Sequence, residues 1–290
     1  MTDTGKIVGA AIVSHHPGLM QTEEFRLNDG AGRDSDLIEG FRRVRAKIDA
    51  AKPDIVVIFD THWFTTGYHL LAGAERYSGN YISDEMPWYL HGVPYDYHGA
   101  PEFADLIQNV AEEREVMAMS IKDSALPAHY ATVNLVKKLE LTEPVLTASN
   151  CQNCESHHFL EMGEVVGEAI RRSGKRIVLL ASGALSPKFN PIDWVRTSPR
   201  IFDAENISSQ ENIDSDREAV VLFEQGRHEV ILERFPTVYA KIPLEGLGGH
   251  YHQMVGAMGG SECRAKGEVL SEYENARGTG NIHIWFGDEE

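Results

Sequence analysis

Short apolar runs and amphipathic stretches alternate along the first sixty residues. Residues 6–14 (KIVGAAIVS) form an apolar run of the length of one buried strand. Ser35 is placed to cap a following helix. The apolar residues that recur there at helical spacing are Leu37, Ile38, Phe41, Val44 and Ile48. Pro53 ends this helix, and IVVIF at 55–59 predicts a second buried strand.

The same alternation returns in the second half of the chain. VLTAS at 145–149 and RIVLLAS at 176–182 predict two strands, and apolar residues from Phe159 to Ile170 recur at helical spacing between them. Residues 214–234 predict two helical segments with a break at Gly226. Strand, helix and strand in succession indicate βαβ units. We therefore expect an α/β fold, a single domain over residues 1–290 with a central, mostly parallel sheet flanked by helices.

Residues 75–101 depart from this pattern because they are rich in aromatic side chains. These are Tyr77, Tyr81, Trp88, Tyr89, Tyr95 and Tyr97. Long excursions in compact domains are often functional, which favours a lid over a pocket. A surface excursion packed by its own aromatic rings explains the same composition, and the pattern leaves the two interpretations open.

Charge and cysteine content limit the classes of partner and compartment. The formal net charge of −17 argues against nucleic acid, which demands a basic face, and against an anionic membrane surface. A small anionic substrate remains compatible with it. Three cysteines without framework spacing favour a reducing compartment. With no signal-like start at residues 1–6 and no apolar span of roughly 20 residues, we expect a cytoplasmic protein.

Two histidines stand directly after predicted strands. His15 follows the first strand in SHHP, and His62 follows the second in FDTHW. Ligands collect at the carboxyl ends of strands in α/β sheets, so these two side chains can converge. Two histidines and one carboxylate form the facial triad of non-haem iron. Hydrogen-bonded structural histidines are the alternative, and this spacing alone does not decide between the two.

A carboxylate ligand cannot be chosen by spacing, because 44 acidic residues compete. Glu245 is attractive because it stands in PLEGLGGHYH, where several glycines let the backbone approach a site closely. The alternative is a turn before a helix, with Glu245 near the N-terminus of that helix.

A second cluster of chemistry-bearing residues is CQNCESHH at 151–158. A zinc site is one interpretation, although a structural zinc usually draws on two separated pairs of ligands. Buried thiols, with His157 or His158 in an active site, are the other. ASGALS at 181–186 does not match the GxSxG nucleophile motif, and no phosphate-binding glycine motif precedes a helix. We therefore expect no nucleotide cofactor.

In combination, SHHP, FDTHW, LASGALS and LEG followed by a glycine-rich helix start resemble the class III extradiol dioxygenases. These are of the protocatechuate 4,5-dioxygenase β-subunit type, and the homoprotocatechuate (3,4-dihydroxyphenylacetate) 2,3-dioxygenases are the most similar subgroup. The resemblance spans nearly the whole chain. It implies one α/β domain, a homodimer or higher homo-oligomer, and Fe(II) held by His15, His62 and Glu245.

One departure from the family pattern affects the expected chemistry. The family usually has a catalytic histidine directly after LASG-x-LS, where this chain has Pro187. Another histidine can take over, the substrate can be acidic enough to need no enzymic base, or the chain can be a degenerate subunit. The histidines available for the first explanation are His129, His157, His158, His250 and His252.

The expected function is a non-haem Fe(II) dioxygenase that uses O2 to open an aromatic ring with adjacent hydroxyl groups, or with a hydroxyl beside an amine. We expect His129 and His157 as acid/base residues. The expected substrate contacts are Tyr130, His158 and His250. A zinc hydrolase and a non-catalytic partner subunit are the alternatives. O2 uptake with a diol distinguishes the dioxygenase from both of them.

Overall fold

The computed structural model describes residues 4–186, 189–203, 205–206, 209–237 and 244–287. Within them, eight strands form one mixed, mostly parallel sheet in the order β6-β3-β7-β2-β8-β1-β12-β9. These strands are β1 (Lys6–Val13), β2 (Ile55–Thr65), β3 (His69–Ala72), β6 (Ala118–Ile121), β7 (Val145–Cys151), β8 (Arg176–Ser182), β9 (Gly267–Val269) and β12 (His283–Phe286). Two small sheets pair β4 (Arg76–Tyr81) with β5 (Val93–His98) and β10 (Glu274–Ala276) with β11 (Thr279–Asn281).

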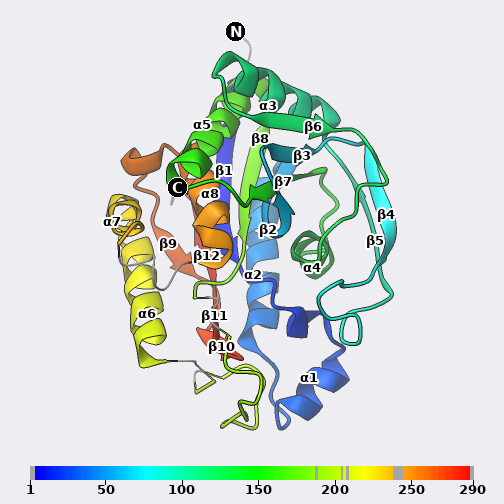
Figure 1. Cartoon of the computed structure of the whole chain (residues 1–290), viewed down its shortest axis with the longest axis vertical. Helices are drawn as coiled ribbons and strands as arrows, with labels where there is room; N and C mark the ends of the chain where they lie inside the picture. Colours follow the sequence, from blue (N-terminus) through cyan, green and yellow to red (C-terminus); the bar gives the residue numbers. More distant parts are fainter. Residues whose placement is uncertain (1–3, 187–188, 204, 207–208, 238–243, 288–290) are drawn as a thin grey trace.

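Helices cover both faces of the large sheet, as Figure 1 shows. They are α1 (Glu23–Asp29), α2 (Asp36–Ala51), α3 (Pro101–Glu113), α4 (Tyr130–Lys138), α5 (Ser156–Ser173), α6 (Gln210–Glu224), α7 (His228–Arg234) and α8 (Gly249–Ala257). Three short 3-10 segments are η1 (Pro17–Met20), η2 (Glu245–Gly248) and η3 (Gly260–Glu262). The fold is therefore the α/β class that the sequence predicts.

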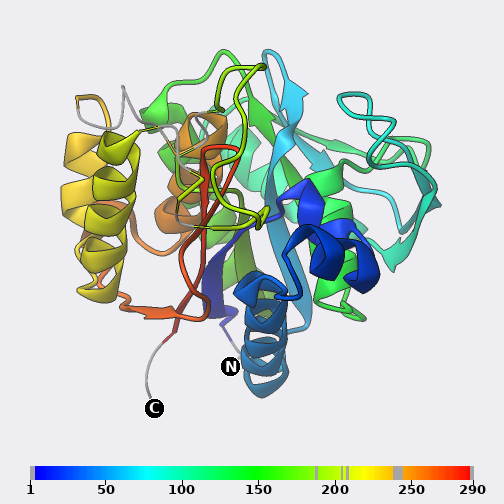
Figure 2. The same cartoon turned by 90° about the horizontal axis from the view of Figure 1, so that it is seen from below.

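Alternate residues of the central strands supply two hydrophobic cores. In β2, Val57 and Phe59 belong to the core built with α3, α5 and α8, whereas Val56 and Ile58 belong to the core built with α2 and α4. The helices α6 and α7 lie at one edge of the molecule, and the β4–β5 excursion lies at the opposite edge (Figure 1, Figure 2).

Several predicted elements are confirmed. The strand at 176–182 has its predicted bounds, and Ser35 caps α2 by accepting a hydrogen bond from the backbone nitrogen of Leu37 at 3.1 Å. Gly226, at φ 66°, separates α6 from α7. The predicted strand at 55–59 is too short, because β2 continues through the polar residues to Thr65.

The aromatic excursion is a hairpin. Tyr77, Tyr81 and Tyr97 are buried in the core on the α2 side of the sheet, whereas Trp88 at the turn is 77% exposed. Neither the lid nor the self-packed surface excursion describes this stretch completely. Its rings fill the core, and its turn reaches His62 of β2.

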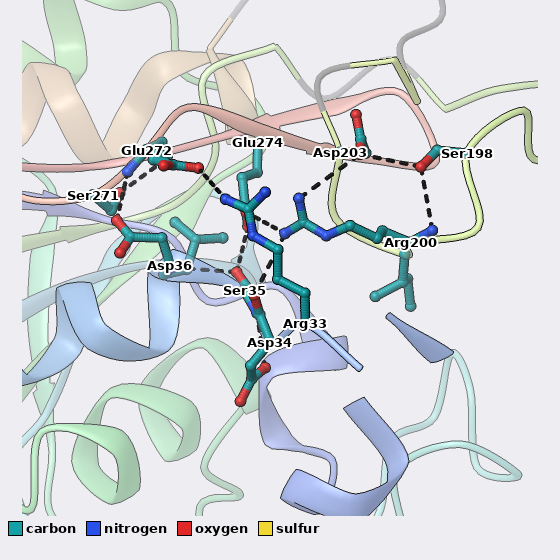
Figure 3. A network of polar contacts seen from close by, with 12 residues as sticks. Arg33, Asp34, Ser35, Asp36, Ser198, Arg200, Asp203, Ser271, Glu272 and Glu274 are labelled. Carbon is teal, nitrogen blue, oxygen red and sulfur yellow. Dashed lines mark hydrogen bonds and ion pairs between the residues drawn. The ribbon is translucent and has the colours of Figure 1, made fainter. Parts of the chain in front are cut away.

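A polar network joins three segments that are distant in sequence, residues 33–36, 198–203 and 271–274 (Figure 3). At its centre the buried Glu274 accepts hydrogen bonds from Ser35 and, at 2.9 Å, from Arg200. This network fixes the chain that follows β8. None of the helices described here is long and apolar enough to span a bilayer.

Candidate metal centre

His62 stands in an irregular part of β2. Phe59 pairs with Ala148 of β7 and Phe64 pairs with Asn150, so five steps along β2 match two along β7. The buried carboxylate of Asp60 holds this bulge, since its Oδ1 accepts hydrogen bonds from the backbone nitrogens of His62 at 2.8 Å and Trp63 at 3.0 Å. Asp60 therefore fixes the backbone at His62 and at the residue that follows it, and this backbone carries the imidazole.

His15 follows the end of β1, as predicted. The preceding residue, Ser14, donates its backbone N–H to Nδ1 of the buried His283 at 3.1 Å. The carbonyl of His15 accepts a hydrogen bond from Asn134 of α4 at 2.7 Å. Both contacts come from elements far away in the sequence, so tertiary packing fixes the direction in which His15 leaves the strand.

Glu245 begins η2 in a turn of unusual backbone. The three following residues, Gly246, Leu247 and Gly248, have left-handed φ values of 58°, 58° and 71°. Asn150, at the end of β7, donates to the carbonyl of Gly246 at 3.0 Å. The backbone N–H of Ala184 donates to Oε2 of Glu245 at 2.6 Å, which leaves Oε1 for other partners.

These three side chains converge on one point. Glu245 Oε1 lies 2.9 Å from His62 Nε2 and 3.4 Å from His15 Nε2. One ligand atom from each residue lies within 4.8 Å of the others, and among the described residues this is the one group of that kind. The side chains of His62 and Glu245 are 14% and 17% exposed, so one side of the group is open.

The electrostatics of the group suit a cation. Burial alone opposes ionisation of the Glu245 carboxyl, but His15 and His62 hold its pKa well below the usual range. Burial likewise opposes protonation of His62, yet its hydrogen bonds with Glu245 and Glu85 raise its pKa to about 10. Without a metal, a proton shared by His62 and Glu245 thus occupies the place that a metal ion would take.

Hydrogen bonds at the far side of both rings favour the tautomer that a metal needs. Ser182 donates to the carbonyl of Ala131 at 3.2 Å, so its oxygen is free to accept from Nδ1 of His15 at 2.9 Å. Nδ1 of His62 faces Glu85 at 3.1 Å. A proton on each Nδ1 leaves each Nε2 with its lone pair directed at Glu245.

Tyr130 completes the surroundings of His62. Its hydroxyl lies 2.6 Å from His62 Nε2, the same atom that faces Glu245. One ring nitrogen cannot satisfy both oxygens, whereas a cation between them can. The set of two imidazoles and one carboxylate with an open side therefore fits a divalent first-row metal such as iron or zinc. Burial and nearby carboxylates raise the pKa of Tyr130 well above its ordinary value, so it remains a phenol.

His129 lies next to Tyr130 but faces another space. Its half-buried ring stacks on Trp63 with centroids 6.4 Å apart. Both residues line a small hollow of about 10 Å³ together with Tyr77 and Tyr97 of the aromatic hairpin. The structure thus places this predicted acid/base residue one position away from the group that faces the triad.

His157 and His158 lie in the first turn of α5. The side chain of His157 is 66% exposed and pairs with Glu155 at 3.6 Å, and Nδ1 of His158 accepts from the backbone nitrogen of Glu155 at 3.0 Å. Within the described part of the chain, no contact joins either histidine to the triad. The structure therefore places His158 in the N-terminal cap of α5 and His157 on the exposed surface beside it.

His250 and His252 are buried in α8. A Cβ at Gly183 would lie 2.6 Å from His250 Nε2, so this ring fills the space beneath the loop after β8. Burial lowers the pKa of His250 to about 3, and the ring is neutral. His252 contacts the carbonyl of Gly248 at 2.8 Å through Nδ1. Pro187, which replaces the family's catalytic histidine, lies outside the described residues.

The CQNCESHH cluster has no convergent ligand set. Cys154 Sγ lies 3.5 Å from His69 Nε2, whereas Cys151 donates to Asn153 at 3.1 Å. Among the described residues, the side chains that converge as potential metal ligands are His15, His62 and Glu245, and none of them belongs to this cluster. These thiols are free cysteines at a turn before α5.

Sequence reasoning missed three residues around the triad, Asp60, Glu85 and Ser182. The Asp-x-His spacing in FDTHW is a signal for Asp60, because aspartate side chains often accept from the backbone nitrogen two residues later. Ser182 stands in ASGALS, where no local pattern points to its contact with His15. No local signal points to Glu85, which stands 23 residues from His62.

A family model described as the catalytic LigB subunit of aromatic ring-opening dioxygenase matches residues 9–287. The chain belongs to this family. The match includes every residue of the triad, and it confirms the resemblance inferred from the sequence motifs.

Individual relatives are similar at modest identity. A 3,4-dihydroxyphenylacetate 2,3-dioxygenase of Escherichia coli is 27% identical over 188 residues, covering 64% of this chain and 67% of that protein. The 2-aminophenol 1,6-dioxygenase β subunit of a Pseudomonas species is 25% identical over 97% of this chain and 93% of its own length. The α subunit of the same enzyme is 24% identical over 84% and 88%.

The fold also matches a solved structure. An uncharacterized protein of Escherichia coli K12, JW3007, superposes with a TM-score of 0.66 at 17% identity, covering 97% of this chain and all of that one. At this identity the match shows the α/β fold alone.

Proposed function

We propose that this protein is an Fe(II)-dependent extradiol dioxygenase that opens an aromatic ring carrying two adjacent donor groups. The observation that carries the proposal is the convergence of His15 Nε2, His62 Nε2 and Glu245 Oε1 with one side open. Two histidines and a carboxylate on one face are the ligand set of non-haem Fe(II) oxygenases. When bound, iron supplies positions for the ring donors and for O2 and a path for electrons between them.

The residues of the chain have separate tasks in this proposal. His15, His62 and Glu245 hold the metal, while Ser182 keeps the ring of His15 turned toward it. The Tyr130 hydroxyl, next to His62 Nε2, can donate a hydrogen bond to a ring hydroxyl or amine and, as a phenol, supply a proton. His129, predicted for that role, lines the adjoining aromatic hollow, so we assign proton transfer to Tyr130 first.

The substrate class follows from the relatives and stays broad. One relative is named for a ring with two hydroxyl groups and another for a ring with a hydroxyl beside an amine. We propose that this chain takes a catechol, an aminophenol or a hydroxypyridine of this kind. We also propose that it assembles as a homodimer or higher homo-oligomer.

The test is purification without oxygen, metal analysis, and O2 consumption against catechols, 2-aminophenol and dihydroxypyridines. About one iron per chain and a ring-opened product with O2 uptake support the proposal. Stoichiometric zinc without O2 uptake on any ring contradicts it and favours a hydrolase or a non-catalytic subunit. The Glu245→Ala variant is the control, because it removes one of the three ligands and should lose both metal and activity.

A further inference from the structure

The turn between β4 and β5 reaches the candidate metal centre through Glu85. Its Oε1 lies 3.1 Å from Nδ1 of His62, the ring nitrogen that faces away from the triad. The two residues come from different elements, since His62 belongs to β2 of the large sheet and Glu85 to the excursion at the edge of the molecule. A segment that the sequence marks only by its aromatic residues thus places a carboxylate against a ligand.

Hydrogen bonds hold the turn that carries Glu85. The buried Ser83 donates its backbone N–H to the carbonyl of Leu90 at 3.0 Å, which closes the turn. Its hydroxyl accepts from the backbone nitrogen of Met86 at 3.1 Å. These bonds flank Glu85 on both sides, so the backbone that carries its carboxylate has a defined position, while the side chain is 48% exposed.

The groups that face Nδ1 of the two histidines differ in charge. A neutral hydroxyl faces Nδ1 of His15, whereas an anionic carboxylate faces Nδ1 of His62. A carboxylate behind an imidazole fixes the ring orientation and makes the opposite nitrogen a stronger metal ligand. Of the two histidines, His62 is therefore the one whose metal-binding nitrogen is strengthened by a carboxylate.

We propose that Glu85 is a positioning residue that orients His62 and strengthens metal binding, so that the β4–β5 turn is a working part of the metal centre. The inference rests on the proposed metal site but not on the reaction that the site performs. Loss of such a partner lowers metal affinity by about 10- to 100-fold in comparable sites.

The experiment compares Glu85→Gln with Asp84→Asn. Both variants remove one negative charge from the same turn, and Asp84 is an exposed neighbour that, among the described residues, does not belong to the triad. Each full-length protein is stripped of metal and titrated with Co(II) without oxygen, and its visible absorption and melting temperature are recorded. We expect Glu85→Gln to bind Co(II) about 10- to 100-fold more weakly with an altered absorption band, and Asp84→Asn to stay within about twofold of the parent.

A third variant separates positioning from folding. Glu85→Asp keeps the charge and should recover part of the Co(II) affinity that Glu85→Gln loses, at an unchanged melting temperature. Equal Co(II) affinities for Glu85→Gln and Asp84→Asn overturn the inference and leave the dioxygenase proposal intact. A weakened Glu85→Gln variant of a protein that consumes no O2 with any ring supports the inference and overturns the dioxygenase. A parent protein that binds no Co(II) overturns both.

Discussion

Asp60 Oδ2 accepts hydrogen bonds from both the backbone nitrogen and the hydroxyl of Thr132, at 3.0 and 2.6 Å. The other oxygen of the same carboxylate holds the backbone of His62. One buried side chain therefore ties the bulge of β2 to the first turn of α4, where Tyr130 stands. The distance between His62, a proposed metal ligand, and the neighbouring phenol is set by Asp60, which has no hydrogen bond with either side chain.

Removal of the Asp60 charge should loosen this connection. We expect Asp60→Asn to lower the free energy of unfolding by about 2 to 3 kcal/mol, because several donors lose a charged acceptor and the new amide must face some of them. Thr132→Val removes the hydroxyl alone and should cost about 1 kcal/mol. Urea denaturation of the metal-free proteins measures both values, and equal stabilities of Asp60→Asn and the parent would contradict this account.

The ion pairs of the network in Figure 3 should differ widely in their contribution to stability. Glu274 is 3% exposed at its side chain, so Arg200→Met leaves a buried carboxylate without its guanidinium and should cost about 3 kcal/mol. In the same network, Arg33 and Glu272 are 62% and 61% exposed, and Arg33→Met should change stability by about 0.5 kcal/mol or less. Thermal melting of the two variants, side by side, tests the contrast.

His283 should make the protein sensitive to acid. Burial lowers its pKa from 6.5 to about 4, and its neutral ring contacts Ser14 through Nδ1 and the carbonyl of Leu37 through Nε2. Between these pH values the unfolded chain takes up a proton that the folded chain refuses, so stability falls as the pH drops from 6.5 to 4. The loss is about 3 kcal/mol for this residue, and it is complete below the folded pKa.

The control for this acid sensitivity is an exposed histidine. His283→Gln should be less stable at pH 7 but should lose this part of the dependence on pH, whereas His91→Gln should keep the slope of the parent. Urea midpoints between pH 4 and 7 give the three slopes. A His283→Gln variant that follows the parent throughout this range would refute the assignment.

Tyr130 should separate metal binding from turnover. Tyr130→Phe keeps the three metal ligands and removes only the hydroxyl beside His62. We expect Co(II) affinity within about threefold of the parent and kcat lowered by about 100-fold, the lower range for loss of an acid/base group. The rate is measured with the ring compound that gives the fastest O2 uptake. Turnover at the parental rate would return the acid/base role to His129.

The sequence predicts the inner strands and the helices α2, α5 and α6, because their patterns are local. The strand at 176–182 and the helix capped by Ser35 both follow from the spacing of apolar residues and one capping side chain. It does not predict β3, a strand of four residues that begins with His69, or the extension of β2 beyond Phe59. Those segments are strands because of what they pair with, and pairing partners are not local.

The candidate site divides in the same way. His15 and His62 can be placed at strand ends from the chain alone, and their convergence with Glu245 is seen in the structure. Among 44 acidic residues, Glu245 is favoured by the glycines that follow it and by the family resemblance, and the spacing of residues alone does not identify it. Asp60 has a local signal in the Asp-x-His spacing of FDTHW. Glu85 has none, since its contact depends on how a hairpin packs against β2.

In the left-handed turn after Glu245, a substitution that raises the stability of the fold would disturb the position of the Glu245 carboxylate. Leu247 has φ 58°, a conformation that costs a side-chain-bearing residue about 1 kcal/mol relative to glycine. A search for heat-resistant variants should therefore recover Leu247→Gly. The same substitution would loosen the backbone that positions Glu245. Selection for thermal stability at Leu247 would therefore reduce order at the carboxylate of the proposed metal site.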